Sequence, residues 1–217
     1  MSGPSCPCCY DVEFDERIAE RDLHDYRRHG PGKTTRVLGS ALAGDGSAGA
    51  AGLTVLDVGG GIGGLHRLLL AAGAASAVDV DASGPYLAAA RREAERLGLG
   101  DRVTFVHGDL VSYAAETQAA DLVGLDRVVC CYVDVDALVG AAARLTRRRL
   151  GIAVPQDGRL ARVAVGAVNI WQRIIRSKLR MRAHDLSRIE AAAATAGLRL
   201  RSVTPVGFWR VLLFERP

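Results

Sequence analysis

Apolar residues follow two different periods along this chain, and the two alternate from residue 53 onward. Short β-type apolar runs, bounded by turn residues, are separated by segments whose apolar positions recur at helical spacing. The predicted strands are Thr54–Val58, Ser76–Val80, Val103–His107, Leu122–Val129, Leu150–Val154, Leu198–Thr204 and Trp209–Glu215. The predicted helices between them are Leu65–Ala72, Pro85–Leu97, Val135–Leu145, Leu160–Arg182 and Leu186–Ala196. Such alternation indicates βαβ units and a mainly parallel sheet.

The last two strands differ from the others in their connection. Only Gly207 separates the apolar runs Leu198–Val206 and Phe208–Arg216, so these runs are expected to form an antiparallel hairpin. The prediction is therefore an α/β fold with a seven-stranded, mostly parallel sheet and a C-terminal antiparallel hairpin.

The residues before this alternation are predicted to form an N-terminal helical segment and a linker. Residues 1–10 are expected to be irregular, and residues 11–30 to be helical up to the stop signal His29-Gly30-Pro31-Gly32. Thr34 or Thr35 is expected to cap a short helix. The Gly/Ala/Ser segment Gly44–Gly52 is expected to be a mobile surface loop.

Composition narrows the class of protein. With 217 residues, 49% of them hydrophobic, residues 1–217 are expected to form one domain, with a cap and linker in 1–50 and the core in 53–217. No window of roughly 18 residues is both apolar and uncharged, so no membrane span is expected. The N-terminus lacks the basic and apolar regions of a secretory leader, which favours a cytoplasmic protein. A net charge of +4 does not by itself indicate a nucleic acid partner.

The five cysteines do not suggest a disulfide framework. Their odd number and the adjacent pairs Cys8-Cys9 and Cys130-Cys131 favour reduced thiols. A metal or arsenical site built from Cys6, Cys8 and Cys9 is the alternative. No CxxC pair or histidine at zinc-ligand spacing accompanies them, so no metal site is predicted.

Aspartates mark the ends of four consecutive predicted strands: Asp57, Asp81, Asp109 and Asp126. Because the carboxyl ends of parallel strands meet at one edge of the sheet, these side chains are expected at the edge where ligands bind. The glycine turn Gly59-Gly60-Gly61 lets a ligand approach backbone N–H groups and a helix N-terminus. Asp81, about 20 residues further on, is placed to accept hydrogen bonds from ribose hydroxyls. Asp109 is placed to accept one from the amine of an adenine.

These motifs together resemble those of class I S-adenosylmethionine-dependent methyltransferases. The first motif of that family stands here as Val55-Leu56-Asp57-Val58-Gly59-Gly60-Gly61-Ile62-Gly63, the second as Asp81-Ala82-Ser83 and the third as Gly108-Asp109. The resemblance covers about residues 53 to 217 and implies a Rossmann-like three-layer sandwich. An NAD-type Rossmann protein is the rival interpretation, because Gly59 to Gly64 also satisfies G-x-G-x-x-G. Asp57, the Gly-Asp motif and the hairpin favour the methyltransferase.

The resemblance implies a role for each cofactor-binding residue. Gly59, Gly61 and Gly63 let the backbone approach the methionine part of S-adenosylmethionine, and Asp57 holds the turn or the methionine ammonium. Asp81 and Ala82 belong to the ribose-binding motif, Asp109 and Leu110 contact adenine, and Asp126 adds a carboxylate at the same edge. Asp79, inside its strand, is expected to be a structural hydrogen-bond acceptor. Because a segment before the core often folds over the cofactor in this superfamily, Tyr26 and Arg28 are further candidates; a solvated helix terminus is the alternative.

The segment after the fifth strand is the most distinctive insertion. Seven Lys or Arg residues and no Asp or Glu lie between Gly158 and His184. If residues 158–182 form a helix, Arg162, Arg173, Arg176 and Arg180 share one stripe and Trp171 points to the opposite side. This helix is predicted to cover the substrate pocket as a lid, and a solvated basic face is the alternative for the arginines. An anionic substrate, a membrane surface or a partner are the functional interpretations of such a face.

Two residues are candidates for a catalytic base, His184 first and Tyr132 second. Methyl transfer to oxygen or nitrogen otherwise needs only desolvation and alignment. The run Leu125–Tyr132 is similar to a segment of magnesium-protoporphyrin O-methyltransferases in which His-Tyr-Pro follows an apolar run. Here Cys131-Tyr132-Val133 stands instead, so we infer kinship in architecture and not a porphyrin substrate.

The sequence thus predicts a methyltransferase that moves a methyl group from S-adenosylmethionine to O or N of a small-molecule metabolite, acidic or aromatic in character. An RNA methyltransferase is one alternative, although no N/D-P-P-Y motif and no appended RNA-binding module is present. A non-catalytic, cofactor-binding partner subunit is another. No DNA partner is predicted, and the sequence leaves a homodimer open.

Overall fold

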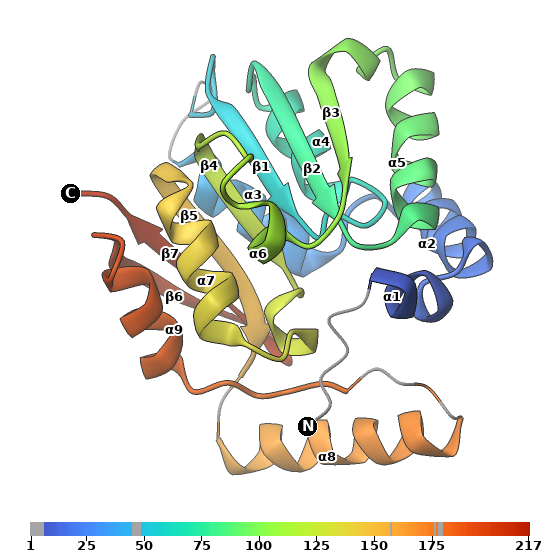
Figure 1. The fold of residues 1–217 in the computed structure, drawn as a ribbon, viewed down its shortest axis with the longest axis vertical. Helices are drawn as coiled ribbons and strands as arrows, with labels where there is room; N and C mark the ends of the chain where they lie inside the picture. The colour runs from blue at the N-terminus through green and yellow to red at the C-terminus, as the bar shows by residue number, and fades with distance from the viewer. Residues whose placement is uncertain (1–6, 45–48, 157, 176, 178–179) are drawn as a thin grey trace.

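A seven-stranded sheet forms the centre of the molecule in the computed structural model, which describes residues 7–44, 49–156, 158–175, 177 and 180–217. The strand order is β3-β2-β1-β4-β5-β7-β6 (Figure 1). The strands are β1 (Thr54–Val58), β2 (Ser76–Asp81), β3 (Val103–His107), β4 (Ala120–Asp126), β5 (Thr146–Pro155), β6 (Arg199–Val206) and β7 (Trp209–Glu215). β7 runs antiparallel to β5 and to β6, and the other pairs are parallel. The predicted mostly parallel sheet with a C-terminal hairpin is confirmed.

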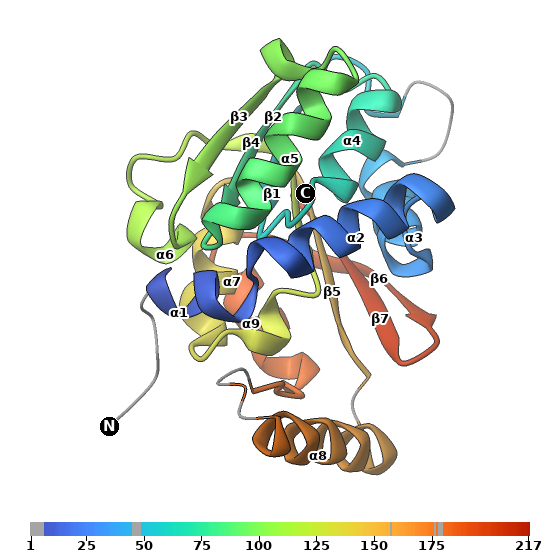
Figure 2. The ribbon, with the colours of Figure 1, turned by 90° about the vertical axis from the view of Figure 1, so that its right-hand side faces the viewer.

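Helices cover both faces of this sheet and make a three-layer molecule. The helices are α1 (Pro7–Glu13), α2 (Glu16–His29), α3 (Lys33–Ala43), α4 (Gly64–Ala71), α5 (Gly84–Arg96), α6 (Leu110–Tyr113), α7 (Val135–Arg144), α8 (Arg159–Ile174) and α9 (Leu186–Ala194), with 3-10 turns η1 (Gly100–Arg102) and η2 (Val129–Cys131). α6, α7 and α9 lie on one face, and α3, α4 and α5 on the other, with α2 outside them (Figures 1 and 2). α8 stands apart from these layers. None of the helices in the described part of the chain is long and apolar enough to span a bilayer.

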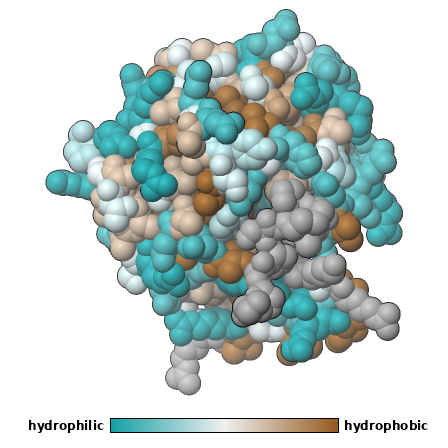
Figure 3. All heavy atoms as spheres, in the orientation of Figure 1, coloured by the Kyte–Doolittle hydropathy of each residue, from teal (hydrophilic) through white to brown (hydrophobic). Residues whose placement is uncertain are grey.

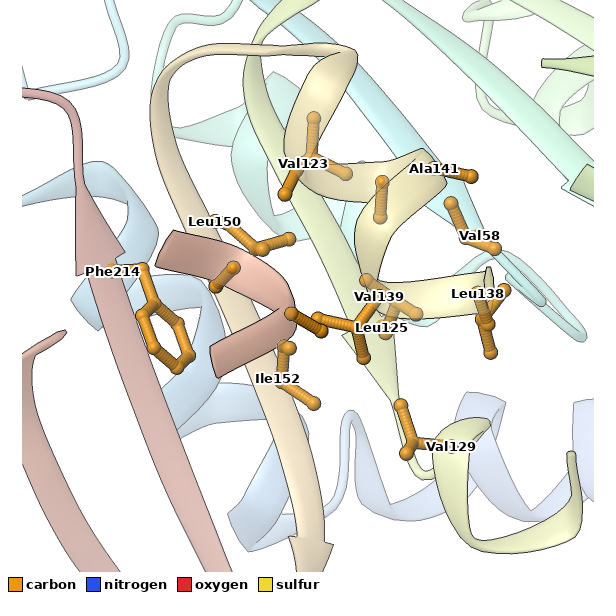
Figure 4. Close-up of a cluster of buried hydrophobic side chains, with 14 of the residues drawn as sticks. Val58, Val123, Leu125, Val129, Leu138, Val139, Ala141, Leu150, Ile152 and Phe214 are labelled. Atoms are coloured by element: carbon orange, nitrogen blue, oxygen red, sulfur yellow. The ribbon is translucent and has the colours of Figure 1, made fainter. Parts of the chain in front are cut away.

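The sheet is buried on both faces, which explains the nearly continuous apolar runs of β1, β4 and β5. Beneath α7 and α9, side chains of the central strands and of the β7 hairpin form the larger core cluster, drawn in Figure 4. A second cluster packs α3 and α4 on the opposite face. Strand order reverses between β1 and β4, because β2 and β3 lie on one side and β5, β7 and β6 on the other. Ligands bind at such a switch point in open α/β sheets.

The N-terminal prediction is corrected in two respects. The expected single helix over residues 11–30 is two helices, because Asp15 adopts an extended conformation and its Oδ1 accepts a hydrogen bond from the Ile18 backbone N–H at 2.9 Å, which caps α2. Residues 7–10, expected to be irregular, belong to α1. Of the expected loop Gly44–Gly52, residues 45–48 lie outside the described residues.

The expected caps of the next helix are also wrong. Gly32 precedes α3, and Thr34 and Thr35 lie inside the helix and are buried. The Thr35 hydroxyl donates a hydrogen bond to Asp126 Oδ2 at 2.5 Å, so its polar group is used across the fold and not at the helix end.

Three boundaries in the second half also differ from the sequence prediction. β4 ends at Asp126 and not at Val129, because the chain turns through Arg127 into η2. β5 begins at Thr146, four residues earlier than predicted, because the charged residues before Leu150 extend its pairing with β4. The short helix α6 was not predicted, and α8 ends at Ile174 and not at Arg182. Of the predicted arginine stripe, Arg162 and Arg173 lie on α8, Arg180 lies beyond it, and Arg176 is outside the described residues.

Candidate functional site

A cavity of about 750 Å³ opens at the carboxyl ends of β1 to β4, the edge at which the strand-end aspartates were expected to meet. Most of the predicted site residues line it, namely Tyr26, Asp57, Gly59, Gly61, Asp81, Ala82, Asp109, Leu110, Asp126 and Tyr132. Arg28, Gly63 and His184 are not among its lining residues. The topology therefore brings together residues that lie more than 100 positions apart in the sequence.

Asp57 ends β1 as a fully buried carboxylate that holds the start of α4. Its Oδ2 accepts hydrogen bonds from the His66 backbone N–H at 3.1 Å and from His66 Nδ1 at 3.0 Å. His66 is the third helical residue of α4, and Gly63 is its N-cap. A negative charge here satisfies a helix N–H group and complements the helix dipole. The acid of the first motif therefore fixes the geometry of the glycine turn.

The glycine turn packs against β2 so tightly that side chains are excluded from it. A Cβ built on Gly60 would lie 2.4 Å from Asp79 Oδ1, so this position requires glycine although the motif leaves it open. Asp79 is fully buried beside Asp57 in the β1–β2 register. Burial and the neighbouring Asp57 and Asp81 carboxylates raise the pKa of Asp79 well above its ordinary value.

Asp81 ends β2 and joins the turn to the next helix. Its Oδ2 accepts a hydrogen bond from the Gly61 backbone N–H and its Oδ1 one from the Ser83 backbone N–H, both at 2.8 Å. Gly61 has a φ of 58°, a conformation that glycine adopts without strain. Burial raises the pKa of Asp81 to about 6, against the opposing effect of those two hydrogen bonds. Each carboxylate oxygen keeps acceptor capacity toward the cavity.

The side chains of Asp109 and Asp126 form hydrogen bonds that connect different segments of the cavity wall. Asp109 caps α6 through the Val111 backbone N–H at 3.1 Å, and its Oδ2 accepts a hydrogen bond from the Tyr132 hydroxyl at 2.7 Å. Burial and this bond raise the pKa of Tyr132 above its ordinary value. Asp126 accepts the Thr35 hydroxyl on one oxygen and lies 3.3 Å from Arg127 Nε on the other. Burial raises the pKa of Asp126.

The N-terminal helices form the outer wall of the cavity. Tyr26 of α2 faces it, and the buried Arg67 guanidinium lies 4.3 Å from the centre of its ring, a cation–π contact. Arg28, two residues further along the helix, is exposed. Tyr10 of α1 and Phe14 also line the cavity, and Phe14 contacts the ring of Tyr86 with centroids 5.5 Å apart. The sequence prediction missed Tyr10 and Phe14 because it placed them in or beside an irregular segment.

The opposite end of the cavity is built from the turn after β4. Arg127 has a φ of 64°, which is unusual for a residue with a side chain and is typical of functional turns. Cys130 and Cys131 follow in η2, with their sulfur atoms 3.7 Å apart, and both line the cavity. Met181 and Trp209 complete this wall from distant segments. No local pattern in the sequence marks these last two residues, since only the fold brings them here.

His184 lies outside this lining. It is half-buried, and its surroundings lower its pKa mainly through burial, while the backbone carbonyls of Val129 and Tyr132 oppose the shift. Of the two predicted base candidates, the structure therefore places Tyr132 at the cavity and His184 behind the turn that carries Tyr132.

The charge of the cavity is predominantly negative. Among the described lining residues there are six aspartates and one arginine: Asp22, Asp25, Asp57, Asp81, Asp109, Asp126 and Arg127. Carboxylates accept hydrogen bonds from hydroxyl, amine and ammonium groups and repel phosphate. This wall fits a cationic nucleoside such as S-adenosylmethionine better than the pyrophosphate of a dinucleotide.

No group of three or more His, Cys, Asp or Glu side chains that could hold a metal ion occurs in the part of the chain that the structure describes. Of the three cysteines in the metal or arsenical alternative, Cys6 lies outside the described residues, as do the side chains of Cys8 and Cys9.

Comparison with protein families gives one match, and it covers the cofactor edge of the sheet. Residues 55–149 match the family described as a methyltransferase domain. This range runs from β1 through the glycine turn and the strand-end aspartates to β5. A comparison with curated protein sequences finds no match.

Methyltransferases are among the solved structures with the same fold. An O-methyltransferase family protein from Burkholderia thailandensis superposes with a TM-score of 0.73 at 20% identity, over 93% of this chain and 60% of that one. Magnesium protoporphyrin IX methyltransferase from Synechocystis, solved with S-adenosylhomocysteine, gives 0.69 at 22% identity, over 96% and 99% of the two chains. An O-methyltransferase from neocarzinostatin biosynthesis, solved with S-adenosylmethionine and 2-hydroxy-5-methyl naphthoic acid, gives 0.64 at 21%, over 95% and 60%.

At these identities the structural likeness establishes only the fold. The evidence for methyl transfer comes from the domain match and from the residues that line the cavity. This chain spans only 60% of the length of the Burkholderia protein, so the substrate of that protein does not transfer with the fold. The glycine turn, the strand-end carboxylates and the matched domain agree on one cofactor. Residues 55–149 match a methyltransferase domain, and the described residues of the cavity fit S-adenosylmethionine as the cofactor.

Proposed function

We propose that this protein transfers a methyl group to an oxygen of a small aromatic molecule that carries an acidic hydroxyl or carboxyl group. The observation that carries this proposal is the composition of the cavity beyond the cofactor edge. There Tyr10, Tyr132 and Trp209 supply aromatic surface, and Arg127 supplies the only cationic side chain among the described lining residues. Aromatic faces bind planar ligands, and a guanidinium binds a carboxylate or phenolate.

The residues around the glycine turn fit the cofactor. Gly61 faces open space, since a Cβ there would meet only the Tyr86 ring at 3.9 Å, so its backbone is accessible to a ligand. Asp81 would hold the ribose diol, Asp109 the adenine side, and the carboxylate-rich wall the positive charge of the methionine part. When bound, S-adenosylmethionine supplies an electrophilic methyl group on a sulfonium sulfur.

Relatives with the same fold support an aromatic acceptor. The neocarzinostatin enzyme was solved with a hydroxylated naphthoic acid, and another O-methyltransferase with apigenin. Magnesium protoporphyrin IX methyltransferase acts on a much larger ring system. The departure of Cys131-Tyr132-Val133 from the His-Tyr-Pro sequence argues against that substrate for this chain.

Alignment and exclusion of water are the main catalytic contributions that we assign to the chain. A phenol or carboxylic acid ionises without a strong base, so the acceptor oxygen needs only to be held in line with the methyl group. Tyr132 keeps its proton at neutral pH because its pKa is raised, and it would position the acceptor or the adenine through Asp109. His184, the other candidate base, does not line the cavity, so it would act on the acceptor only through the turn that carries Tyr132; burial lowers its pKa.

Calorimetry with S-adenosylhomocysteine tests the cofactor half of the proposal. We expect wild-type protein to bind it and Asp81→Ala to lose about tenfold or more in affinity, because charge-assisted hydrogen bonds contribute on the order of 1.5–3 kcal/mol each. Asp101→Ala, in the exposed turn η1, is the matched control and should bind normally. Tight binding of NAD in place of S-adenosylhomocysteine would contradict the assignment.

A panel of aromatic acids and phenols, assayed by release of S-adenosylhomocysteine, tests the acceptor half. Turnover on a panel member that Arg127→Met weakens through KM supports the proposal. Cofactor binding without turnover on any small molecule would favour a non-catalytic partner subunit. Salt-dependent binding and methylation of RNA would favour the RNA methyltransferase alternative.

A further inference from the structure

α8 presents its apolar side to solvent and not to the protein. Val163, Ile170, Trp171 and Ile174 are each more than 60% exposed, and Ala167 between them is also exposed. These positions follow one another at spacings of three, four and one residues and therefore share one face of the helix. We call them the outward stripe. In Figure 3, hydrophobic residues appear along the lower edge of the molecule, where Figure 1 places α8.

The inward side of α8 combines small apolar side chains with two amides. Val165 is the only buried residue among the α8 side chains that the structure describes, and Asn169 and Gln172 share its side of the helix. Asn169 bonds the backbone of Met181 twice, donating from Nδ2 to the Met181 carbonyl and accepting the Met181 N–H on Oδ1, both at 2.8 Å. The largest apolar side chains of this helix thus face outward, whereas an ordinary surface helix turns such side chains toward the protein.

Basic residues accompany the outward stripe. Arg162 and Arg173 are exposed on α8, and the segment between Gly158 and His184 contains seven Lys or Arg residues and no acid. Arg162 lies 3.1 Å from Asp185, which follows that segment, so the charge is only partly neutralised. An apolar face with an exposed tryptophan and flanking arginines is typical of helices that lie in the interface of an anionic membrane.

A second copy of this chain fits the surface less well than a lipid surface does. In an antiparallel two-fold dimer the same patch meets itself with the arginines of both copies on one side, and a parallel dimer supplies no negative charge for them. A bilayer containing anionic lipids offers apolar depth for the stripe and negative charge for the arginines. We propose that the outward stripe of α8 docks this protein on the surface of a membrane that contains anionic lipids.

This docking would bring the cavity close to the lipid surface. Met181, which α8 holds through Asn169, lines the cavity, and Arg182 donates its backbone N–H to the Cys130 carbonyl at 2.7 Å. The acceptor end of the cavity and the lipid-facing helix are therefore joined by one short segment. An apolar aromatic acceptor dissolved in the bilayer would enter from that side.

Flotation of the full chain with phospholipid vesicles tests the proposal without any methyl acceptor. Wild-type protein should float with phosphatidylcholine vesicles that contain phosphatidylglycerol, and about tenfold less with phosphatidylcholine alone or at high salt. The double variant Ile170→Glu/Ile174→Glu should reduce the binding by about tenfold or more. Leu97→Glu/Val203→Glu, which adds the same charge at exposed apolar positions away from α8, is the matched control and should float as wild type.

Further measurements separate docking from misfolding and from self-association. Each variant should still bind S-adenosylhomocysteine in calorimetry, because no described residue of α8 lines the cavity. Arg173→Glu should weaken flotation while it leaves the stripe intact. The proposal is overturned if wild-type protein does not float with the anionic vesicles, or if the Ile170/Ile174 variant floats equally well. It is also overturned if wild type is a dimer that these changes convert to a monomer while vesicle binding is absent.

Discussion

Two helical segments flank the cavity, and they are attached to the core in opposite ways. α1 and α2 are joined to α5 and the loop before it by several polar contacts: the Gly84 backbone N–H donates to Asp11, the Ser83 hydroxyl to the Phe14 carbonyl, the Tyr86 hydroxyl to Asp22 and Arg27 to Glu93. They also share a small apolar cluster with α5. α8 buries one described side chain and makes its described contacts mainly through Arg162 and Asn169.

This difference matches the two ligands that the cavity is proposed to bind, the cofactor and the methyl acceptor. The cofactor has one shape, so the wall beside it can be fixed before binding, and preorganisation avoids the entropy cost of closing a loop on the ligand. The wall on the acceptor side connects to α8, whose outward stripe is exposed among the described residues. The proposed docking on a membrane would cover that stripe.

The largest effect on stability and cofactor binding is expected when the contacts between α2 and α5 are broken. Glu93 is buried and accepts hydrogen bonds from Arg96 and Arg27, which lower its pKa to about 2. Glu93→Ala should lower the free energy of unfolding by about 2 kcal/mol, since hydrogen bonds to charged groups contribute on the order of 1.5–3 kcal/mol, and should weaken binding of S-adenosylhomocysteine. Urea denaturation and calorimetry measure both. Glu95→Ala, an exposed acid on the same helix, is the control; equal effects of the two changes would show that α2 does not depend on Glu93.

A change of pH is expected to have an effect of intermediate size, and to act on the affinity for the cofactor. Ribose hydroxyls donate to an ionised carboxylate, so binding favours the charged form of Asp81, whose pKa in the free protein is raised to about 6. Affinity should therefore be highest above pH 6 and fall about tenfold between pH 7 and pH 5 as Asp81 takes up a proton. Calorimetry with S-adenosylhomocysteine across this range measures the change. In Asp81→Asn the dependence should disappear; a dependence that persists there would assign the titration to another group.

The smallest effect is expected where α8 is loosened. Asn169→Ala removes both hydrogen bonds to Met181, which are partly exposed, and should lower the free energy of unfolding by about 1 kcal/mol or less. Affinity for S-adenosylhomocysteine should not change, whereas KM for an acceptor should rise because Met181 lines that end of the cavity. Gln172→Ala, on the same side of the helix, is the control. A loss of cofactor affinity in Asn169→Ala would contradict the division of the cavity into two walls.

The sheet could be predicted from the sequence because its signals are local. β1, β3 and β7 have the predicted bounds, since each is an apolar run with turn residues on both sides. The βαβ alternation predicted the parallel pairing, and the short Gly207 turn predicted the antiparallel hairpin. The errors fall where the local pattern is ambiguous. Val128 and Val129 extend the apolar run of β4 into η2, and the charged residues at the start of β5 conceal its pairing with β4.

The cofactor side of the cavity was predictable for a related reason. Asp57, Asp81, Asp109 and Asp126 occupy strand ends, and parallel strands bring their carboxyl ends to one edge. The acceptor side was not predictable in this way. Trp209 starts the last strand and Met181 lies in an irregular segment, and their place at the cavity depends on β7 running antiparallel beside β5 and on the contact of Met181 with Asn169.

The orientation of the apolar face of α8 could not be predicted from the sequence either. The sequence establishes that the helix is amphipathic and basic, because these are properties of spacing and composition. It does not establish which side meets the protein, and the expectation of an apolar side closed over the cavity is not met, since Ile170, Trp171 and Ile174 are exposed. By itself the sequence determined the α/β fold, the glycine turn and the carboxylates of the cofactor edge, all of which follow from local period and strand polarity. Only the tertiary structure decided which distant side chains complete the acceptor end and which face of α8 is left to solvent, because both depend on contacts between segments that no local pattern encodes.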